Sequence, residues 1–444
     1  MEPRQETELG LLPSCWEVAA LGRYLNEAQY GLSLKGNDTG SCPLLRMTNQ
    51  VNGRISPSKL QFVEVTEGIL SKFRLQRGDI LFNRTNSLDL VGRTAIFDID
   101  GEFVFASYLI RLRCQDQHLD PFFLNLYLNA EATQRRLKSI ATRGVSQSNI
   151  SATRLRGFLI PIPPVAEQRK IAVILGILQR AIEQQERFIA LSAELKNALM
   201  HKLFTEGIRS ERQRQTEIGL VPESWEVVPL GQFLTESQYG LSVRGRDAGQ
   251  YALLRMTNQV EGQISPHDLQ YVELTSQQFR KFQVHKFDIL FNRTNSLELV
   301  GRTAIFDIDG DFVFASYLIR LRTDAERLRS SFLNHYFNWI ETQVRLKSIA
   351  TQAVSQSNIS ATRLRGFPVA VPRPEDQDEI VEKVECLNKK LLVHAQKKRL
   401  LEELFHALLH QLMTAQIRVH DLDLNNLDLN SSDQREEVIA TTGR

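Results

Sequence analysis

The residues of this sequence that are best suited to chemistry are arginines, amides and hydroxyls that occur in two matched sets. Arg can donate two hydrogen bonds to guanine and Asn or Gln can pair with adenine, while Ser and Thr hydroxyls hold phosphates. These residue types therefore predict contact with DNA. The candidates of the first set are Arg84, Thr85, Asn86, Arg93, Ser146, Gln147, Asn149 and Arg154, and those of the second are Arg293, Thr294, Asn295, Arg302, Ser355, Gln356, Asn358 and Arg363.

An ordinary structural use of the same residues stays open. Asn and Ser side chains also cap helices and build turns, so any one of these positions could serve the fold alone. The strings that carry the two sets are among the least altered between the two copies, and they include DILFNRTNSL and VSQSNISATRLRGF. A shared task or a shared core explains such strings, and we expect their apolar letters to be buried.

Signatures of catalysis do not occur in the sequence. It has no GxxxxGK[ST] phosphate loop, no HExxH and no NPPY-type tetrapeptide that would hold a target amine for methylation. Asp98 and Asp100 could in principle hold a metal, but a strand that ends in a glycine turn explains them better. His201 and His410 are expected to lie at the ends of long helices, where a histidine favours the helix dipole. We therefore expect no catalytic residue, no metal site and no cofactor bound by this chain.

Length and composition limit the class of protein. A chain of 444 residues is too long for one ordinary core, so two or more domains are expected. No apolar run reaches the roughly 18 residues of a membrane span, and the N-terminus is polar, so we expect a cytoplasmic protein. The four cysteines form no CxxC pair, which speaks against a zinc site and a disulfide framework.

Net charge gives only a weak indication of a partner. The whole chain carries +2 and residues 419–444 carry −4, so the body carries 2 − (−4) = +6. Where the basic residues lie matters more than this small excess. The acidic tail is polar, and we expect it to be disordered or to pack as a strap on a neighbour.

A duplication organises the whole chain. Arg46 of the string LLRMTNQV returns as Arg255, an offset of 255 − 46 = 209, and the same offset relates Trp16 to Trp225. The register does not slip from one end of the repeat to the other. We therefore predict a globular domain at 1–163, a long helix at 164–209, a short join at 210–215, a second globular domain at 216–372, a second long helix at 373–418 and a tail at 419–444.

Each globular domain is expected to be α/β. Strand-like runs such as DILFNR, TAIFDID and FVFASYLIRLR stand beside a helical stretch near residues 120–142. The string IPIPPVAEQ ends the last strand and opens the long helix, and Glu167 lies near the helix start, where an acid favours the dipole.

Both long helices carry one apolar seam with heptad spacing. A single seam needs a partner helix to cover it, and the nearest candidate is the other copy. The join at 210–215 spans at most about 20 Å, whereas a helix from Ile171 to Leu203 is roughly 50 Å long. We therefore predict an antiparallel coiled coil with a pseudo-two-fold axis. The seam residues are Ile171, Leu175, Leu178, Ile182 and Ile189 in the first copy and Ile380, Val384, Leu387, Leu391, Leu401, Phe405 and Leu408 in the second.

The doubled order of parts resembles the specificity subunit of type I restriction-modification enzymes. The string DILFNRTNSLxLVGRTAIF and the polar loop followed by IPIPP are similar to those of the target recognition domains of that family. So is the Pro-x-x-Glu-Gln-like turn at Pro164–Gln168 that opens the long helix. The resemblance covers Thr7–Arg418. It implies two α/β target recognition domains in tandem that bind double-stranded DNA without catalysing a reaction.

The resemblance also implies partners. Two modification (methyltransferase) subunits would bring S-adenosylmethionine and methylate adenine, and restriction subunits would bring ATP, Mg and cleavage. Most members of the family carry two dissimilar recognition domains and read an asymmetric bipartite site. Because the domains of this chain are near copies, we expect two inverted copies of one half-site around an unread spacer. Arg143 of the first copy corresponds to Gln352 of the second, so the two half-sites could differ at one base.

Two other classes of protein stay as alternatives. One is a fused methyltransferase or nuclease, whose cofactor loop or acidic metal motif is missing from the sequence. The other is a non-catalytic coiled-coil adaptor whose globular domains bind protein, which the composition does not exclude. Methyl transfer by the isolated chain would favour the first, and none by a mixture with its modification partner would favour the second.

Overall fold

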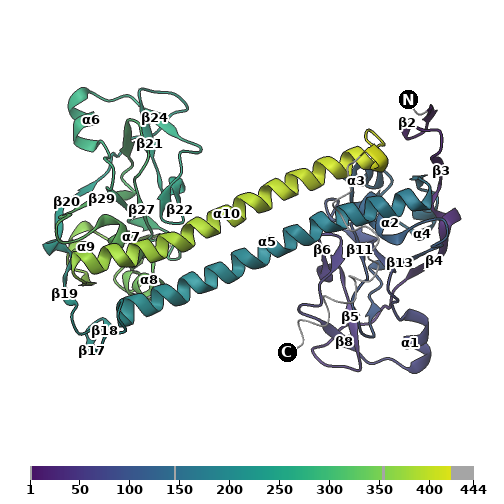
Figure 1. Cartoon of the computed structure of the whole chain (residues 1–444), viewed down its shortest axis with the longest axis horizontal. Coiled ribbons are helices and arrows are strands. Elements are labelled where there is room, and N and C mark those ends of the chain that lie inside the picture. Colours follow the sequence, from purple (N-terminus) through teal and green to yellow (C-terminus); the bar gives the residue numbers. More distant parts are fainter. Residues whose placement is uncertain (1–2, 145–146, 353–355, 422–444) are drawn as a thin grey trace. The chain divides into compact units, whose positions relative to one another are not determined.

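The chain divides into two compact units. The computed structural model describes residues 3–144, 147–352 and 356–421. Unit 1 comprises Met1–Gln185 with Lys397–Arg444, and unit 2 comprises Glu186–Gln396. Each unit holds one globular domain and one part of each of the two longest helices, α5 (Val165–Glu206) and α10 (Pro374–Met413) (Figure 1).

The globular domain of unit 1 is built on a six-stranded mixed sheet. Its strands follow the order β4 (Leu25–Tyr30), β13 (Leu109–Cys114), β9 (Ile80–Asn83), β11 (Thr94–Ile96), β7 (Arg54–Ile55) and β6 (Gln50–Val51). Smaller sheets are β12 (Val104–Phe105), β5 (Cys42–Leu45) and β8 (Gln61–Val63); β10 (Thr85–Asn86), β15 (Ser148–Asn149) and β14 (Thr142–Arg143); β16 (Leu159–Ile162) with β3 (Glu17–Ala20); and β1 (Arg4–Thr7) with β2 (Gly10–Pro13). The short helices are α1 (Glu67–Phe73), α2 (Pro121–Asn129), α3 (Glu131–Ser139) and α4 (Ala152–Arg156), with 3-10 turns at Leu21–Tyr24, Met47–Asn49 and Val419–Asp421.

The six-stranded sheet is covered on both faces, and the sequence of β9 shows why. Its residues Ile-Leu-Phe-Asn are all buried, as expected for a strand with no solvent face. Because successive side chains of a strand point to opposite faces, Ile80 and Phe82 join the cluster that includes Phe123 of α2, whereas Leu81 joins the cluster with Phe105 of β12.

Unit 2 repeats this domain at the offset of 209 residues. Its six-stranded sheet is β20 (Leu234–Tyr239), β29 (Leu318–Thr323), β25 (Ile289–Asn292), β27 (Thr303–Ile305), β23 (Gln263–Ile264) and β22 (Gln259–Val260). The smaller sheets are β24 (Gln270–Val272), β21 (Tyr251–Leu254) and β28 (Phe312–Phe314); β26 (Thr294–Asn295), β31 (Ser357–Asn358) and β30 (Thr351–Gln352); β19 (Glu226–Pro229) with β32 (Pro368–Val371); and β17 (Gln213–Thr216) with β18 (Gly219–Pro222). The helices are α6 (Ser276–Phe282), α7 (Ser330–Asn338), α8 (Ile340–Ser348) and α9 (Ala361–Arg365), with 3-10 turns at Leu230–Gln232 and Met256–Asn258.

The two longest helices contribute to the core of both units. In unit 1, Ile171 and Leu175 of α5 share one buried cluster with Leu412 of α10. In unit 2, Phe204 of α5 shares a buried cluster with Ile380 of α10. Within each unit, therefore, the end of one long helix packs into the same core as the start of the other.

The predicted seam residues differ in burial along these helices. Those that lie in or against the two buried clusters are Ile171, Leu175, Phe405 and Leu408 in unit 1 and Ile380 and Val384 in unit 2. Leu387 is buried as well. Half-buried members are Leu178, Ile182, Ile189, Leu391 and Leu401. The seam is thus covered most fully where the helices meet a globular domain.

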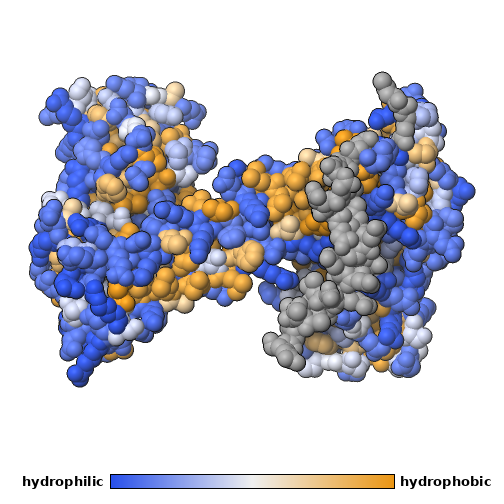
Figure 2. Space-filling view, viewed as in Figure 1, coloured by the Kyte–Doolittle hydropathy of each residue, from blue (hydrophilic) through white to orange (hydrophobic). Residues whose placement is uncertain are grey.

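Surface hydropathy distinguishes the long helices from the globular domains. Figure 2 shows hydrophilic residues over most of the visible face of the domains, with apolar residues gathered along parts of α5 and α10. On the part of α5 in unit 2, Leu191 and Leu195 are 60% and 57% exposed. Among the described residues, no helix is long and apolar enough to cross a membrane.

The four cysteines divide into two environments. Cys42 and Cys114 are buried, and burial raises the pKa of both thiols above its usual value. Cys15 and Cys386 are exposed. None of the four takes part in a disulfide.

These environments predict the reactivity of the thiols. Because the thiolate is the reactive species, we expect two thiols to react rapidly with an aromatic disulfide reagent at pH 8 and two to react only after unfolding. Titration before and after addition of guanidinium chloride measures both numbers. Rapid reaction of all four thiols in the folded protein would contradict the packing around β5 and β13.

A histidine–carboxylate pair joins a globular domain to a long helix in unit 2. His335 of α7 lies with Nε2 2.8 Å from Oε1 of Glu385 on α10. The hydrogen bond from His335 is the main cause that lowers the pKa of Glu385, and the positive charge of Lys196 adds to it. The corresponding residues of unit 1 are Leu126 and Gly176, so this pair belongs to unit 2 alone.

The lowered pKa of Glu385 predicts how this pair depends on pH. A carboxylate whose folded pKa lies below its unfolded value stabilises the fold above the unfolded pKa, and this contribution is lost as the pH falls through the folded pKa. We expect Glu385→Gln to lower the unfolding temperature at pH 7, and the difference from the unchanged protein to shrink below about pH 4.5. Unfolding temperatures between pH 3 and 8 test this, and a difference that grows on acidification would contradict it.

Candidate nucleic-acid interface

Two tyrosines and an arginine meet at one end of the six-stranded sheet of unit 1. Tyr30 is the last residue of β4, Arg84 follows the last residue of β9, and Tyr108 precedes the first residue of β13. Because β13 pairs antiparallel with both β4 and β9, these three positions share one sheet end. The backbone amide of Arg84 donates to the carbonyl of Tyr108 at 3.0 Å. We call these residues, with Tyr239, Arg293 and Tyr317 of unit 2, the tyrosine–arginine surfaces.

Glycine next to Tyr30 makes this close arrangement possible. A Cβ atom at Gly31 would lie 2.3 Å from the carbonyl oxygen of Phe105 and 2.4 Å from that of Ala106. No side chain fits at that distance, so only glycine lets the end of β4 pass this close to β12. The same is true of Gly240, whose Cβ atom would lie 2.3 Å from the carbonyl oxygen of Ala315.

The guanidinium of Arg84 is held by its neighbours. Its Cζ atom lies 4.7 Å from the centre of the Tyr30 ring, and its Nη1 donates to the carbonyl of Ser107 at 3.3 Å. Its Nε is buried and has no hydrogen-bond partner. The Tyr30 hydroxyl in turn accepts from the backbone amide of Ala152 at 2.9 Å. Arg84 is therefore fixed in orientation before any ligand arrives.

A three-stranded sheet brings the two polar strings of the sequence together. In it Thr85 of β10 pairs with Asn149 of β15, which also pairs with Thr142 of β14. The side chain of Asn149 donates to the Thr85 hydroxyl at 2.7 Å, and Arg154 donates to the Thr142 hydroxyl at 2.6 Å. These candidates hold one another in place, so the structural use of polar residues that the sequence left open accounts for much of their bonding.

The remaining candidates of unit 1 lie around this sheet. The Asn86 side chain donates to the sulfur of Met47 at 3.0 Å and accepts from the amide of Ser87. Arg93 and Gln147 are exposed. Among the described residues neither of their side chains makes a hydrogen bond or an ion pair. The candidate Ser146 lies outside the described residues, as does Ser355 of the second set.

Unit 2 builds the same arrangement. Arg293 lies 4.7 Å from the centre of the Tyr239 ring and donates to the carbonyl of Ser316 at 3.3 Å. Its Nη2 also donates to Oδ1 of Asn358 at 3.3 Å, and Asn358 donates to the Thr294 hydroxyl at 2.6 Å.

The other candidates of unit 2 match those of unit 1. Asn295 donates to the sulfur of Met256 at 3.0 Å, and Arg363 donates to the Thr351 hydroxyl at 2.6 Å. Arg302 and Gln356 are exposed. The two sets of candidates thus occupy equivalent positions in the two units.

The tyrosines were missed by the sequence predictions. Tyr30 and Tyr108 are 40% and 49% exposed, and Tyr239 and Tyr317 are 41% and 46% exposed. Their strings QYGLS and FVFASYLIRLR recur in both copies, and the second was interpreted as a strand. In the sequence each of these tyrosines stands next to Gly or Ser, but this does not indicate whether its ring is buried or exposed.

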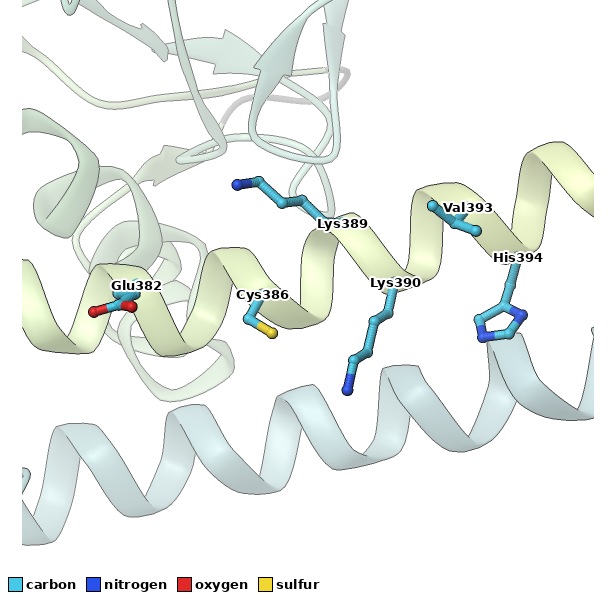
Figure 3. A pocket seen from close by; sticks show the side chains of 6 residues that line it. All are labelled: Glu382, Cys386, Lys389, Lys390, Val393 and His394. Carbon is cyan, nitrogen blue, oxygen red and sulfur yellow. The ribbon is translucent and has the colours of Figure 1, made fainter.

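Two hollows of the surface include no residue of the tyrosine–arginine surfaces. One, of about 420 Å³, is a groove on α10 lined by Glu382, Cys386, Lys389, Lys390, Val393 and His394. Figure 3 shows Cys386 and Lys390 directed toward the neighbouring helix and Lys389 directed away from it. The ring of His394 lies 5.2 Å from that of Phe188. Within the described parts of the chain, no cluster of three or more His, Cys, Asp or Glu side chains could hold a metal.

The class of this protein follows from comparison of its sequence with the profiles of known families. The profile described as the type I restriction modification DNA specificity domain matches residues 21–190 and again residues 222–403. The chain therefore belongs to this family and carries two such domains in tandem, one in each copy of the repeat. Its class is the type I restriction-modification specificity subunit.

Individual relatives agree with this class along almost the whole chain. The putative type I restriction enzyme MjaX specificity subunit of Methanocaldococcus jannaschii is 28% identical over 431 residues, which cover 94% of this chain and 96% of the relative. The type I restriction enzyme StySPI specificity subunit of Salmonella potsdam is 24% identical, covering 78% of this chain and 75% of the relative.

Solved structures share the fold. The crystal structure of a type I restriction-modification S subunit from M. genitalium matches with a TM-score of 0.58 at 16% identity, over 89% of this chain and 95% of the other. A chain from a structural study of complex assembly and conformational transition of the type I R-M system matches with a TM-score of 0.51 at 16% identity, over 91% and 99%.

Proposed function

We propose that this chain binds double-stranded DNA at a specific sequence and directs partner subunits to it, without catalysing a reaction itself. The observation that carries the proposal is that the specificity-domain profile matches twice, and that each match contains the same tyrosine–arginine surface. Recognition of a DNA sequence without catalysis also agrees with the absence of catalytic motifs from the amino-acid sequence.

The near identity of the two domains supports a bipartite site with two inverted, similar half-sites. Between Asp79–Arg113 and Asp288–Arg322 only two positions differ, where Asp89 stands against Glu298 and Glu102 against Asp311. Domains this alike are expected to prefer alike bases. An antiparallel coiled coil of α5 and α10 would relate the domains by a pseudo-two-fold axis and leave an unread spacer between the half-sites. Within each unit, the start of one long helix and the end of the other pack into one buried cluster, which supports that pairing.

The proposed partners are two modification subunits and, for cleavage, restriction subunits. S-adenosylmethionine, ATP and Mg would be bound by those subunits, and adenine in each half-site would be the methylated base. This complex would act on DNA in the cytoplasm. The relatives are named as specificity subunits of type I restriction enzymes, which supports this assignment of partners.

Methylation mapping tests the palindromic site directly. When the chain is produced with its modification partner in a host that lacks methylated adenine, we expect one bipartite motif whose two halves are inverted copies, or differ by one base. Single-molecule sequencing of the host DNA reads both halves and the spacer. Two unrelated half-sites would refute the palindrome, and methylation by the chain without its partner would refute the non-catalytic role.

A further inference from the structure

The charge of Arg84 lacks a counter-charge in unit 1. Among the described residues, no carboxylate oxygen lies within 4.0 Å of this guanidinium, the limit for an ion pair. Its Nε is nevertheless fully buried. Other arginines of the same sheet are paired. Arg111 contacts Glu27 at 2.9 Å, and Arg113 contacts Asp79 at 2.8 Å. A partly buried cation without an anion is costly, so a ligand that supplies negative charge is favoured there.

Unit 2 repeats the unpaired charge. Arg293 also lacks an ion pair with any carboxylate of the described residues, and its Nε is buried without a partner. The equivalent arginines Arg320 and Arg322 again bind carboxylates, at 2.6 Å and 2.8 Å. Because the same exception recurs at the same position of both copies, the feature belongs to the fold and not to one local arrangement.

The way these guanidiniums are bonded favours a phosphate over a base. Reading guanine requires two parallel N–H groups that point at O6 and N7. In Arg84 the Nε is buried and Nη1 already donates to Ser107, and in Arg293 both Nη1 and Nη2 donate to protein oxygens. Both arginines thus share a positive charge that protein contacts hold in place and that has part of its N–H groups committed to the protein, and such a charge suits a phosphate oxygen.

The tyrosines provide the second part of the site. Tyr30 holds the Arg84 guanidinium from one side, at 4.7 Å from ring centre to Cζ, and Tyr239 does the same for Arg293. Tyr108 and Tyr317 are about half exposed beside them. A phenol hydroxyl next to a bound phosphate can donate a further hydrogen bond to the DNA backbone.

We propose that Arg84 and Arg293, positioned by stacking on Tyr30 and Tyr239, each bind one backbone phosphate of a DNA half-site and add affinity without reading a base. This inference rests on the proposed function, because it assigns a role within the same DNA complex. Sequence preference then resides in other residues of each domain. The two phosphates occupy equivalent places in the two half-sites, because the two arginines occupy equivalent places in the repeat.

Salt dependence separates a phosphate contact from a base contact. The chain with its modification partner is measured on DNA that contains the methylated motif and on DNA that lacks it, between 50 and 300 mM KCl. Each phosphate contact contributes about 0.9 to the slope of log K against log salt. For the double variant Arg84→Gln with Arg293→Gln we expect a slope smaller by about 2 and an affinity lower by about tenfold per arginine on both DNAs.

The chain itself offers a matched control. Arg23 and Arg74 are exposed and ion-paired with Glu17 and Glu102, and the residues at their positions in the second copy are Gln232 and Gln283. The double variant Arg23→Gln with Arg74→Gln therefore removes the same charge at positions where the fold accepts glutamine. It should leave the slope within about 0.5 of the unchanged protein, as expected when no phosphate contact is lost.

Ethylation interference locates the contacts and does not depend on affinity alone. We expect Arg84→Lys to weaken interference at one phosphate of one half-site and Arg293→Lys to weaken it at the equivalent phosphate of the other. Tyr30→Phe should keep the interference pattern, and Tyr30→Ala should weaken interference only at the phosphate that Arg84→Lys affects, whereas general damage to the fold would weaken it across the half-site. These single variants keep the test usable if the glutamine double variant fails to fold.

The outcomes are distinct. The inference would be overturned if the arginine variants left both the salt slope and the interference pattern unchanged. It would also be overturned if they relaxed the preference at one base pair while their affinity for unrelated DNA stayed unchanged. If the unchanged complex showed no preference for any sequence, the proposed function would fail instead. A smaller slope, equal losses on both DNAs and retained base preference would support the phosphate contact.

Discussion

Insertion of two heptads into both α5 and α10 should abolish binding to the original DNA site. If the helices pair as proposed, 14 residues lengthen the pair by roughly 21 Å at about 1.5 Å per residue, which matches about six base pairs. Six base pairs also rotate one DNA half-site by a little over half a turn relative to the other. The two recognition domains would then face half-sites on different sides of the duplex.

Insertion of three heptads is the matched control for this rotation. It adds roughly 31 Å, close to the 34–36 Å of one DNA turn. We therefore expect the longer variant to bind DNA whose spacer is extended by about nine or ten base pairs. Selection from random DNA by the complex of chain and modification partner reads the spacer length of every variant.

The converse change removes two heptads from each helix, for example residues 183–196 and 392–405, which correspond at the offset of 209. It should shorten the preferred spacer or abolish binding, because the apolar seam keeps its phase while the pair loses length. A preferred spacer that stayed the same after either insertion or deletion would refute the idea that helix length sets it.

Glu167→Ala should destabilise unit 1 by about 3–5 kcal/mol, the cost of breaking a buried ion pair by removal of its carboxylate. Glu167 accepts from Arg418 at 2.7 and 2.8 Å and from the Trp16 indole at 3.1 Å. The Arg418 side chain is only 10% exposed, and its bond to Glu167 raises the pKa of the guanidinium. Removal of the carboxylate takes two short hydrogen bonds from a buried guanidinium and leaves the indole N–H without this acceptor.

Asp376→Ala is the matched control in unit 2, because Asp376 stands 209 residues after Glu167. Asp376 pairs with Arg209 at 2.9 Å, but the Arg209 side chain is 59% exposed and water can solvate it. We expect this variant to lose no more than about 1 kcal/mol. Urea unfolding followed by Trp16 fluorescence, with Trp225 and Trp339 replaced by Phe, measures the Glu167 variant in unit 1. Trp225 fluorescence, with Trp16 and Trp339 replaced by Phe, measures the Asp376 variant in unit 2. Equal losses from both substitutions would contradict the role of burial.

Much of the architecture could be predicted because it follows from patterns along the chain. The constant offset revealed the duplication, and the profile match to each copy confirms two specificity domains in tandem. Apolar strings such as DILF were expected to be core, and β9 is buried throughout. Periodicity and repetition are local properties, so they can be read without knowing which strands become neighbours.

The candidate site was less predictable. Thr85, Asn149 and Arg154 were selected by residue type, but the structure shows them bonded within a small sheet whose strands come from distant parts of the chain. Their contact with DNA stays a prediction. Tyr30 and Tyr108 were not selected at all, because their exposure depends on where β4 and β13 end.

The sequence by itself determined the duplication, the two α/β domains, the long helices and the polar strings that both copies share. Only the tertiary structure decided that Tyr30, Arg84 and Tyr108 meet at one sheet end, and that Arg84 and Arg293 lack the carboxylates that pair with their neighbours. The physical reason is that charge compensation and exposure depend on distances across strands. Those distances are set by sheet pairing between residues tens of positions apart, and no spacing along the chain encodes them.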